Sequence, residues 1–315
     1  MKLCVVIPVY KVEDTLVRCV ESVVRQDIPG MEVILVDDGS PDRCPEMCEQ
    51  LAAQYDCVRT IHKTNGGLSS ARNAGIAIAQ CDYITFVDSD DYVEEESYNK
   101  IINILEKHSE YDILEYPVME FYGSSKAHHL SFNNTKYTSA QHYWLNGCAY
   151  AHTYAWNKFY RMSLFDDVRY PEGKVFEDVW TLPLLLKKAR CVGTCNEGLY
   201  YYCMNDSGIT STAGGKQFKM LLDAHITALQ SMNLPQGVDL LRYYMHIVNT
   251  QIQTYEYDKR KITLPKIKIG SEIIQYLNAP DVPKIAKIKC LIIKLFNLNI
   301  LCRLINSLNK KQTNH

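Results

Sequence analysis

The sequence predicts an α/β protein built on a mostly parallel sheet with helices on both faces. The first hundred residues alternate short apolar runs with segments that have apolar residues at helical spacing. The apolar runs are hydrophobic throughout, which is the pattern of strands buried on both faces. A helix between successive strands provides the crossover that a parallel pair needs. These three observations point to one doubly covered sheet.

The elements follow in a regular order along the chain. Strands are expected at 3–9, 32–38, 58–63 and 83–88, and helices at 15–26, 45–55 and 69–80. From 101 to 215 the alternation loosens into mixed elements rich in aromatic residues. From 216 the chain becomes helical, most clearly at 216–232. We therefore expect a domain at 1–215 and a helical C-terminal region at 216–315.

Composition narrows the class of protein. Hydrophobic residues make up 47% and charged residues 22%, with a formal net charge of -2, which fits a globular protein and gives no sign of a nucleic-acid partner. The twelve cysteines are scattered along the chain, which favours a reduced, cytoplasmic setting over a disulfide scaffold. No apolar run approaches the roughly 18 residues of a membrane span. We expect a protein that is soluble or peripheral to a membrane.

Polar and turn-forming residues follow each of the first four predicted strands. In a parallel α/β sheet the ligand site lies outside the carboxyl ends of the strands, so these residues are candidates for a binding site. They are Pro8, Val9 and Tyr10 after the first strand, Asp37, Asp38, Gly39 and Ser40 after the second, Asn65, Gly66 and Gly67 after the third, and Asp88, Ser89, Asp90 and Asp91 after the fourth.

Three carboxylates, Asp88, Asp90 and Asp91, come directly after the strand that ends at Val87. An Asp-x-Asp pair suits a hard divalent cation such as Mg²⁺ or Mn²⁺, which would offset the repulsion and could bridge to a diphosphate. The alternative is that these acids open a helix, because Asp and Ser are good N-caps and the helix dipole favours early acids.

The other strand ends allow similar pairs of interpretations. Asp37 and Asp38 either form an ordinary turn or accept hydrogen bonds from a nucleoside. The "NGGLSSARNAG" segment either is a turn with Ser69 or Ser70 as helix cap, or lets the backbone approach a ligand at its glycines while Arg72 reaches a phosphate or base.

Together, the segments "VIPVYKVEDTL", "VDDGSPD", "NGGLSSARNAG" and "FVDSDD" resemble the family 2 glycosyltransferases, enzymes with the GT-A fold. The resemblance covers residues 1 to about 100 in the family's order. It implies a nucleotide-binding half at 1–100, an acceptor-binding half at 101–215, a nucleotide-sugar donor, usually a UDP-sugar, and Mn²⁺ or Mg²⁺. The residues it implies in that half are Pro8, Val9 and Tyr10 framing the nucleoside, Asp38 on the uracil with Asp37 beside it, Asn65 and Arg72 lining the nucleotide pocket, and Asp88, Ser89 and Asp90 at the ribose and metal, the metal being held by Asp90 and Asp88.

The second half extends the resemblance. "FEDVWTLPLL" is similar to the family's Glu-Asp motif, which implies Asp178 as general base and Glu177 as its neighbour; the alternative is that both acids only begin a helix near Val179. "AWNKFY" is similar to a Trp-x-Lys segment, which implies Trp156 against a sugar and Lys158 near phosphate or acceptor; the alternative is a core aromatic with a lysine that extends to solvent. In the segment "YYYCMNDSGITS", which is similar to a Tyr-rich strand and turn of the family, the family often has a basic residue, whereas this chain has Met204 and Asn205.

The function that we predict is inverting sugar transfer from a nucleotide-sugar to a hydroxyl of a glycan acceptor in surface polysaccharide biosynthesis, and we expect that acceptor to be lipid-linked. A sugar nucleotidyltransferase is the alternative enzyme, but it calls for a glycine-rich, basic loop after the first strand, which this sequence lacks. A non-catalytic nucleotide-sugar-binding subunit is the alternative outside enzymes.

The segment 283–315 has seven lysines and arginines and no acidic residue. Its periodicity puts Ile285, Ile288, Ile292, Leu295 and Cys302 near one helical stripe. Such a helix either lies in an anionic membrane interface, at the inner face of the cell membrane, or packs its stripe on the rest of the protein.

Overall fold

The structure is a computed structural model that describes residues 1–206, 208 and 210–312, with side chains described as far as residue 308. The last three residues of the predicted basic tail therefore lie outside the described part. The chain divides into two compact units. The first unit comprises Met1–Ala140 and Thr153–Gly208, and the second comprises Gln141–His152 and Ile209–His315.

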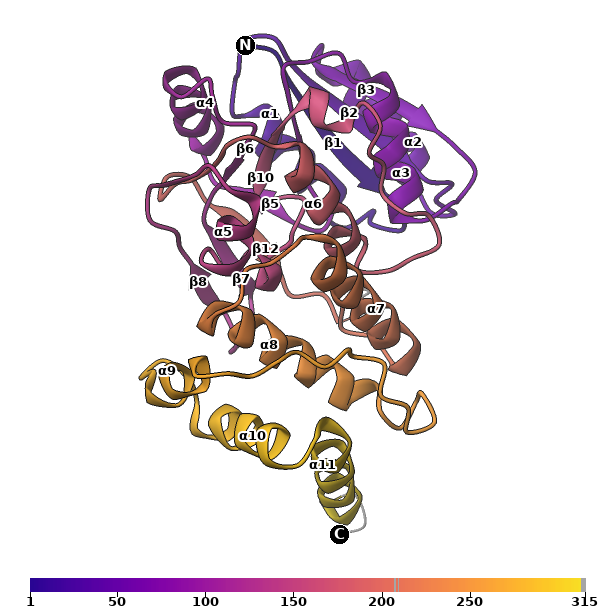
Figure 1. Cartoon of the computed structure of the whole chain (residues 1–315). Coiled ribbons are helices and arrows are strands. Elements are labelled where there is room, and N and C mark those ends of the chain that lie inside the picture. The colour runs from indigo at the N-terminus through magenta and orange to yellow at the C-terminus, as the bar shows by residue number, and fades with distance from the viewer. Residues whose placement is uncertain (207, 209, 313–315) are drawn as a thin grey trace. The chain divides into compact units, whose positions relative to one another are not determined.

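The first unit begins with the predicted alternation of strands and helices (Figure 1). Its elements are β1 (Leu3–Val9), α1 (Leu16–Val24), β2 (Met31–Asp37), α2 (Cys44–Gln54), β3 (Val58–His62), α3 (Leu68–Ile78) and β4 (Tyr83–Phe86). The four strands pair in parallel in the order β3-β2-β1-β4. Each predicted element is confirmed to within two residues.

Both faces of this sheet are covered, as the unbroken apolar strands predict. Val5 and Ile7 share a buried core with the apolar residues of α1 and α2. On the opposite face α3 lies so close to β1 that a Cβ on Gly75 would come within 2.4 Å of the Val6 side chain. Only glycine permits that approach, which brings Arg72, on the same helix, against the sheet.

The large sheet continues beyond β4 with strands from later in the chain. Its full order is β3-β2-β1-β4-β10-β6-β11-β9, and β10 is antiparallel to both of its neighbours. The added strands are β6 (Ile113–Glu115), β9 (Thr135–Tyr137), β10 (Lys158–Arg161) and β11 (Val192–Thr194). The sheet is thus mostly parallel with antiparallel additions.

A second, four-stranded sheet has the order β5-β12-β7-β8. Its strands are β5 (Tyr92–Val93), β7 (Val118–Tyr122), β8 (His128–Leu130) and β12 (Tyr200–Cys203), and the helices of this part are α4 (Ser97–Lys107) and α6 (Glu177–Lys188). The turn 88–91 between β4 and β5 contains three aspartates, and we call it the acidic turn. Because β5 follows directly on this turn, the second sheet fixes the end of the turn.

The second unit is helical. Its helices are α7 (Gly215–Ser231), α8 (Val238–Thr254), α9 (Glu272–Asn278), α10 (Lys284–Leu295) and α11 (Leu298–Gln312), joined by most of α5 (Ala140–Leu145). The division differs from the expected one at 215, because residues 141–152 pack with these helices. Trp144 and Tyr150 contact the Tyr243 ring, with centroids 5.6 Å and 4.7 Å away. No helix among the described residues is long and apolar enough to cross a bilayer.

Candidate functional site

The acidic turn after β4 forms the centre of the candidate site. Asp91 is fully buried and accepts hydrogen bonds from the Tyr200 hydroxyl (2.9 Å) and the Cys203 amide (2.7 Å). The chain then enters β5, and the next helix, α4, begins only at Ser97. The helix-cap alternative for these acids is therefore wrong. Asp91 instead fastens the turn to β12.

Asp88 and Asp90 remain closer to solvent than Asp91. Asp88 accepts a hydrogen bond from Arg72 (2.8 Å), and Asp90 accepts one from the Asn205 amide (2.7 Å). Burial and the repulsion from Asp88 raise the pKa of Asp90 above its ordinary value. Two carboxylates that repel each other are suitable donors for Mg²⁺ or Mn²⁺. Among the described residues, however, no group of three or more His, Cys, Asp or Glu side chains is arranged to hold a metal ion.

Arg72 joins this turn to the second half of the first unit. Its guanidinium is buried, with 1% of the side chain exposed, and it donates to three carboxylates. The distances are 2.8 Å to Asp88, 2.5 Å to Glu177 and 3.1 Å to Asp178. The ring of Tyr170 lies 5.3 Å from the guanidinium carbon. One buried cation thus joins Asp88 to the adjacent acids Glu177 and Asp178, which come from a distant part of the chain.

Glu177 and Asp178 form the first turn of α6, which the left-handed backbone of Phe176 (φ 55°) introduces. Asp178 also accepts the Ala155 amide at 3.2 Å and keeps 16% of its side chain exposed. Burial raises the pKa of Asp178 to about 7; Glu177 and Asp88 add to the rise, and Arg72 opposes it. A carboxyl that titrates near neutral pH and still reaches solvent is suited to take a proton from a bound hydroxyl.

The loops after β2 and β3 are held together by Asp38. Its carboxylate accepts hydrogen bonds from Lys63 (2.6 Å) and from the amides of Gly66 (3.0 Å) and Gly67 (2.7 Å). Asp37 accepts the Ser40 amide at 2.9 Å and pairs with His62. Both acids therefore make the contacts expected if they form an ordinary turn. A nucleoside that bound here would contact Asp38 as part of an ordered loop.

The remaining nucleotide-side residues are spread over the same strand ends. Pro8 and Val9 are buried in β1, whereas Tyr10 is 43% exposed and Asn65 is exposed. The alternative in which Ser69 or Ser70 caps the helix is wrong, because α3 begins at Leu68 with Gly67 before it.

An open pocket of about 780 Å³ lies beside these loops. It is lined by the loop after β1 and the start of α1, by the loop after β2, by Asp90, and by the end of β12 with the segment after it: Lys11, Val12, Glu13, Asp14, Thr15, Arg18, Pro41, Asp42, Asp90, Cys203, Met204, Asn205 and Asp206. Thr15 binds the turn directly, donating to the Ser89 carbonyl at 2.9 Å. The acidic turn thus forms one wall of a cavity large enough for a nucleotide.

Comparison with known proteins identifies the fold and the family. Residues 4–169 match the sequence model described as "Glycosyl transferase family 2". The chain belongs to that family. The GT-A fold expected from the four segments is also confirmed. The structure of Staphylococcus aureus TarS 1–349 in complex with UDP-GlcNAc superposes over 99% of this chain and 92% of that one, with a TM-score of 0.68 and 19% identity.

Proteins similar in sequence include EpsJ, an uncharacterized glycosyltransferase of Bacillus subtilis, with 32% identity over 70% of this chain and 65% of EpsJ. GlyG of Streptococcus pneumoniae is 31% identical over 66% of this chain and 72% of GlyG. The minor teichoic acid biosynthesis protein GgaB of B. subtilis is 30% identical over 68% of this chain. The match spans less than two thirds of EpsJ and only 24% of GgaB.

Two residues suggested by the family 2 resemblance have partners inside the protein. Trp156 is 3% exposed and lies between the rings of Tyr154 and Tyr200, at centroid distances of 4.4 Å and 4.3 Å. Lys158 is fully buried and pairs with Glu115 at 2.8 Å. In this conformation neither side chain is free to contact a sugar, and both have the packing expected of core residues.

Sequence reasoning did not predict the contacts of three residues that support this family 2 site. Asn205, which stands near the position of an expected basic residue, holds Asp90. Tyr170 covers Arg72. Arg18 donates to the Asp90 carbonyl at 2.6 Å and lies over the Tyr92 ring. No spacing pattern marks them, because each reaches the site from a different part of the chain.

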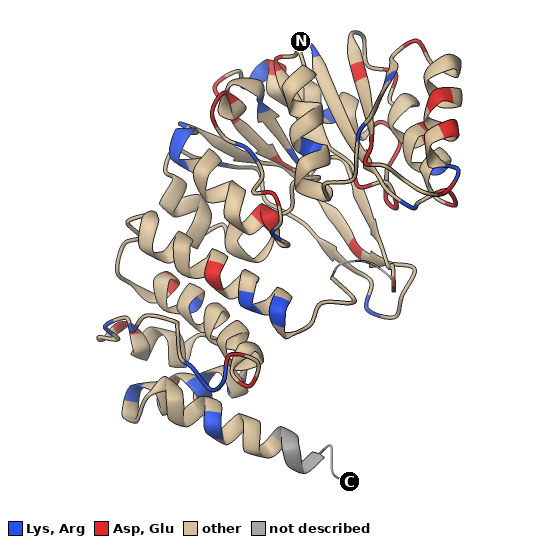
Figure 2. Cartoon of the chain, turned by 90° about the vertical axis from the view of Figure 1, so that its right-hand side faces the viewer, with Lys and Arg blue, Asp and Glu red and all other residues tan. Residues whose placement is uncertain are grey.

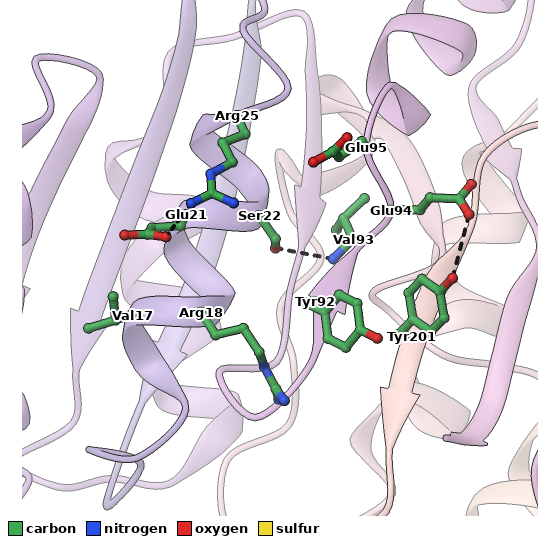
Figure 3. Close-up of a pocket in the computed structure, with 10 residues that line it drawn as sticks. All are labelled: Val17, Arg18, Glu21, Ser22, Arg25, Tyr92, Val93, Glu94, Glu95 and Tyr201. Atoms are coloured by element: carbon green, nitrogen blue, oxygen red, sulfur yellow. Dashed lines mark hydrogen bonds and ion pairs between the residues drawn. The ribbon is translucent and has the colours of Figure 1, made fainter. Parts of the chain in front are cut away.

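Arg18 also lines a second pocket, of about 590 Å³, between α1 and β5 (Figure 3). There Glu21 pairs with Arg25 at 2.7 Å, and Ser22 accepts the Val93 amide at 3.1 Å. Arg18 therefore lines both pockets and contacts the acidic turn through the Asp90 carbonyl.

Proposed function

We propose that this protein is an inverting glycosyltransferase that moves a sugar from a nucleotide-sugar, a UDP-sugar being favoured, to a hydroxyl of a glycan acceptor. The observation that carries the proposal is the Arg72 cluster. It brings Asp178, whose pKa is raised to about 7, to the same guanidinium as Asp88 of the acidic turn. Family membership and the TarS structures with UDP-GlcNAc and with UDP support the class of donor.

Asp178 is the proposed general base. In the transfer, the acceptor oxygen forms a bond to the anomeric carbon while the bond from that carbon to the diphosphate breaks. The proton of the acceptor hydroxyl passes to the Asp178 carboxylate. Attack on the face opposite the diphosphate inverts the anomeric centre. Arg72 limits the rise in the pKa of Asp178, so a useful fraction of the base is ionised near neutral pH.

The residues after β1 to β4 are proposed to bind the donor. Asp38 would contact the base of the nucleoside, and Asn65 would line its pocket. Asp88 and Asp90 would hold Mg²⁺ or Mn²⁺, which would supply positive charge to the departing diphosphate. The raised pKa of Asp90 is consistent with a pair of carboxylates that a cation would stabilise.

The acceptor is proposed to be a lipid-linked glycan in the synthesis of a surface polysaccharide. Relatives named for teichoic acid biosynthesis and for poly(ribitol-phosphate) glucosyl transfer support this class of product. A peripheral position at the inner face of the cell membrane would bring such an acceptor to the cytoplasmic enzyme.

The test is nucleotide release from a panel of UDP-, GDP- and CMP-sugars, with and without Mn²⁺ and with extracted lipid-linked glycans as acceptors. We expect release from a UDP-sugar that depends on the metal. Asp178→Asn should abolish transfer while UDP still binds, and Asp90→Ala should weaken metal-dependent UDP binding. Exposed Glu172→Gln is the control on the loop before α6. Transfer at the normal rate by Asp178→Asn would refute the proposed base, and no release from any donor would refute the activity.

A further inference from the structure

The last two helices of the second unit expose several large apolar side chains. On α10 and at its end these are Ile285 (60% exposed), Ile288 (52%), Leu295 (72%) and Phe296 (64%). On α11 they are Leu304 (50%) and Leu308 (61%). We call these six residues the apolar face. A soluble protein seldom exposes so many large apolar residues over one short segment without a partner.

The two helices are nevertheless packed into the second unit by another stripe. Cys290, Leu298, Leu301 and Cys302 are all less than 5% exposed. The packing alternative is therefore wrong for Ile285, Ile288 and Leu295 of the predicted stripe, whose side chains stay exposed. Cys302, which periodicity placed on the same stripe, belongs to the packed side. Because packing already fixes the helices, the apolar face is presented on an ordered surface.

The charge of the segment identifies the kind of partner. From Val282 to His315 the sequence has seven lysines and arginines and no acidic residue. Figure 2 shows Lys and Arg, but no Asp or Glu, along the described part of the last two helices. Lys284, Lys294 and Arg303 are exposed beside the apolar face. Lysine is depleted at the cores of protein interfaces. Cations along the margin of an apolar helix are instead typical of helices that lie in an anionic membrane interface.

We propose that α10 and α11 dock on an anionic lipid bilayer, with the apolar face in the interface and the cations at the headgroups. Opposite charge would bring the segment to the surface, and burial of Leu295, Phe296 and their neighbours would retain it. The inference depends on the second unit alone and does not depend on the proposed transfer reaction. Failure of one would leave the other standing.

The experiment is cosedimentation of the full chain with vesicles of phosphatidylcholine, with and without phosphatidylglycerol. We expect binding to the mixed vesicles that weakens as salt is added, and little binding to phosphatidylcholine alone. The double variant Leu295→Glu/Phe296→Glu should lower the partition coefficient at least tenfold. Leu184→Glu, at a residue 44% exposed on α6 of the first unit, is the matched control and should bind as the wild type does.

A second variant separates charge from apolar contact. Lys284→Glu/Arg303→Glu keeps the apolar face and should lose binding to the mixed vesicles while its thermal unfolding is unchanged. Binding that survives both double variants, or no binding to the mixed vesicles at all, would overturn the proposal. A wild-type dimer in light scattering that Leu295→Glu/Phe296→Glu converts to a monomer, with no lipid binding, would identify a second copy as the partner and also overturn it.

Discussion

Replacing Asp178 with Asn should make the protein more stable while it removes the proposed base. The folded protein holds the Asp178 carboxyl at a pKa of about 7, whereas an aspartate in an unfolded chain titrates near about 3.9. Between these values the folded state keeps a proton that the unfolded chain has released. The free energy of unfolding of the wild type therefore falls as pH rises through this window. Asn does not titrate, so the free energy of unfolding of the variant does not fall for this reason as pH rises.

The structure sets the size of the effect. At 1.36 kcal/mol per pKa unit, a rise from about 3.9 to about 7 corresponds to ~4 kcal/mol at high pH, of which ~3 kcal/mol accrues between pH 5 and pH 8. The Asp178 side chain is only 16% exposed, so solvent screens little of it. For a unit of this size each kcal/mol changes the Tm by about 2–4 °C, which gives roughly 6–12 °C of additional stabilisation at pH 8 relative to pH 5.

The assay is thermal unfolding of wild type, Asp178→Asn and the control Glu172→Gln from pH 5 to pH 9. We expect the Tm advantage of Asp178→Asn to grow up to about pH 8 and then stay level, while the control follows the wild type. The opposite result is equally clear. If Asp178→Asn unfolded more easily than the wild type at pH 8, the fold would need the charge of Asp178 as a partner of Arg72, and the reasoning would be refuted.

Two further predictions concern the frame around the site. Gly39→Ala should cost ~1–3 kcal/mol in urea unfolding, because φ at Gly39 is +69° and a Cβ would lie 2.9 Å from the Asn65 amide nitrogen; an unchanged urea midpoint would contradict the close approach of the two loops. Lys158→Met should cost ~3–5 kcal/mol by leaving Glu115 buried without its cation. Adding Glu115→Gln should restore part of the loss in the same assay, and the absence of any loss in the single variant would show that the pair is not a buried ion pair.

The first half of the fold follows from local pattern. Unbroken apolar runs separated by helical periodicity are sufficient to predict β1 to β4 and their helices, since each signal lies within a few residues. The same reasoning predicts that Asp38, Asn65 and Asp88 lie at one edge of the sheet, because parallel strands end there. It cannot predict that β10 inserts between β4 and β6, since that pairing depends on contacts between distant parts of the chain.

Partners of the candidate residues are equally distant in sequence. Trp156 has an aromatic ring of the kind that stacks on sugars. Whether a face of that ring is free to do so depends on Tyr200, which is distant in the sequence. Lys158 looks like an exposed cation until its partner Glu115 is known. The segment 141–152 joins the second unit through Trp144 and Tyr150, whose contacts with α8 leave no periodic signal. These features depend on three-dimensional proximity, which a single sequence does not contain.

The arrangement around Arg72 also constrains how this protein can evolve. One buried guanidinium pairs with Asp88, Glu177 and Asp178, so the loss of Arg72 would leave three acids without the cation that they share. Conversely, the loss of any one acid changes the charge that the others and Arg72 experience. Loss of Arg72 should therefore be better tolerated when acids that it contacts are lost with it, and across related sequences the four positions should change together. Selection should therefore act on Arg72 and Asp88 together with Glu177 and Asp178.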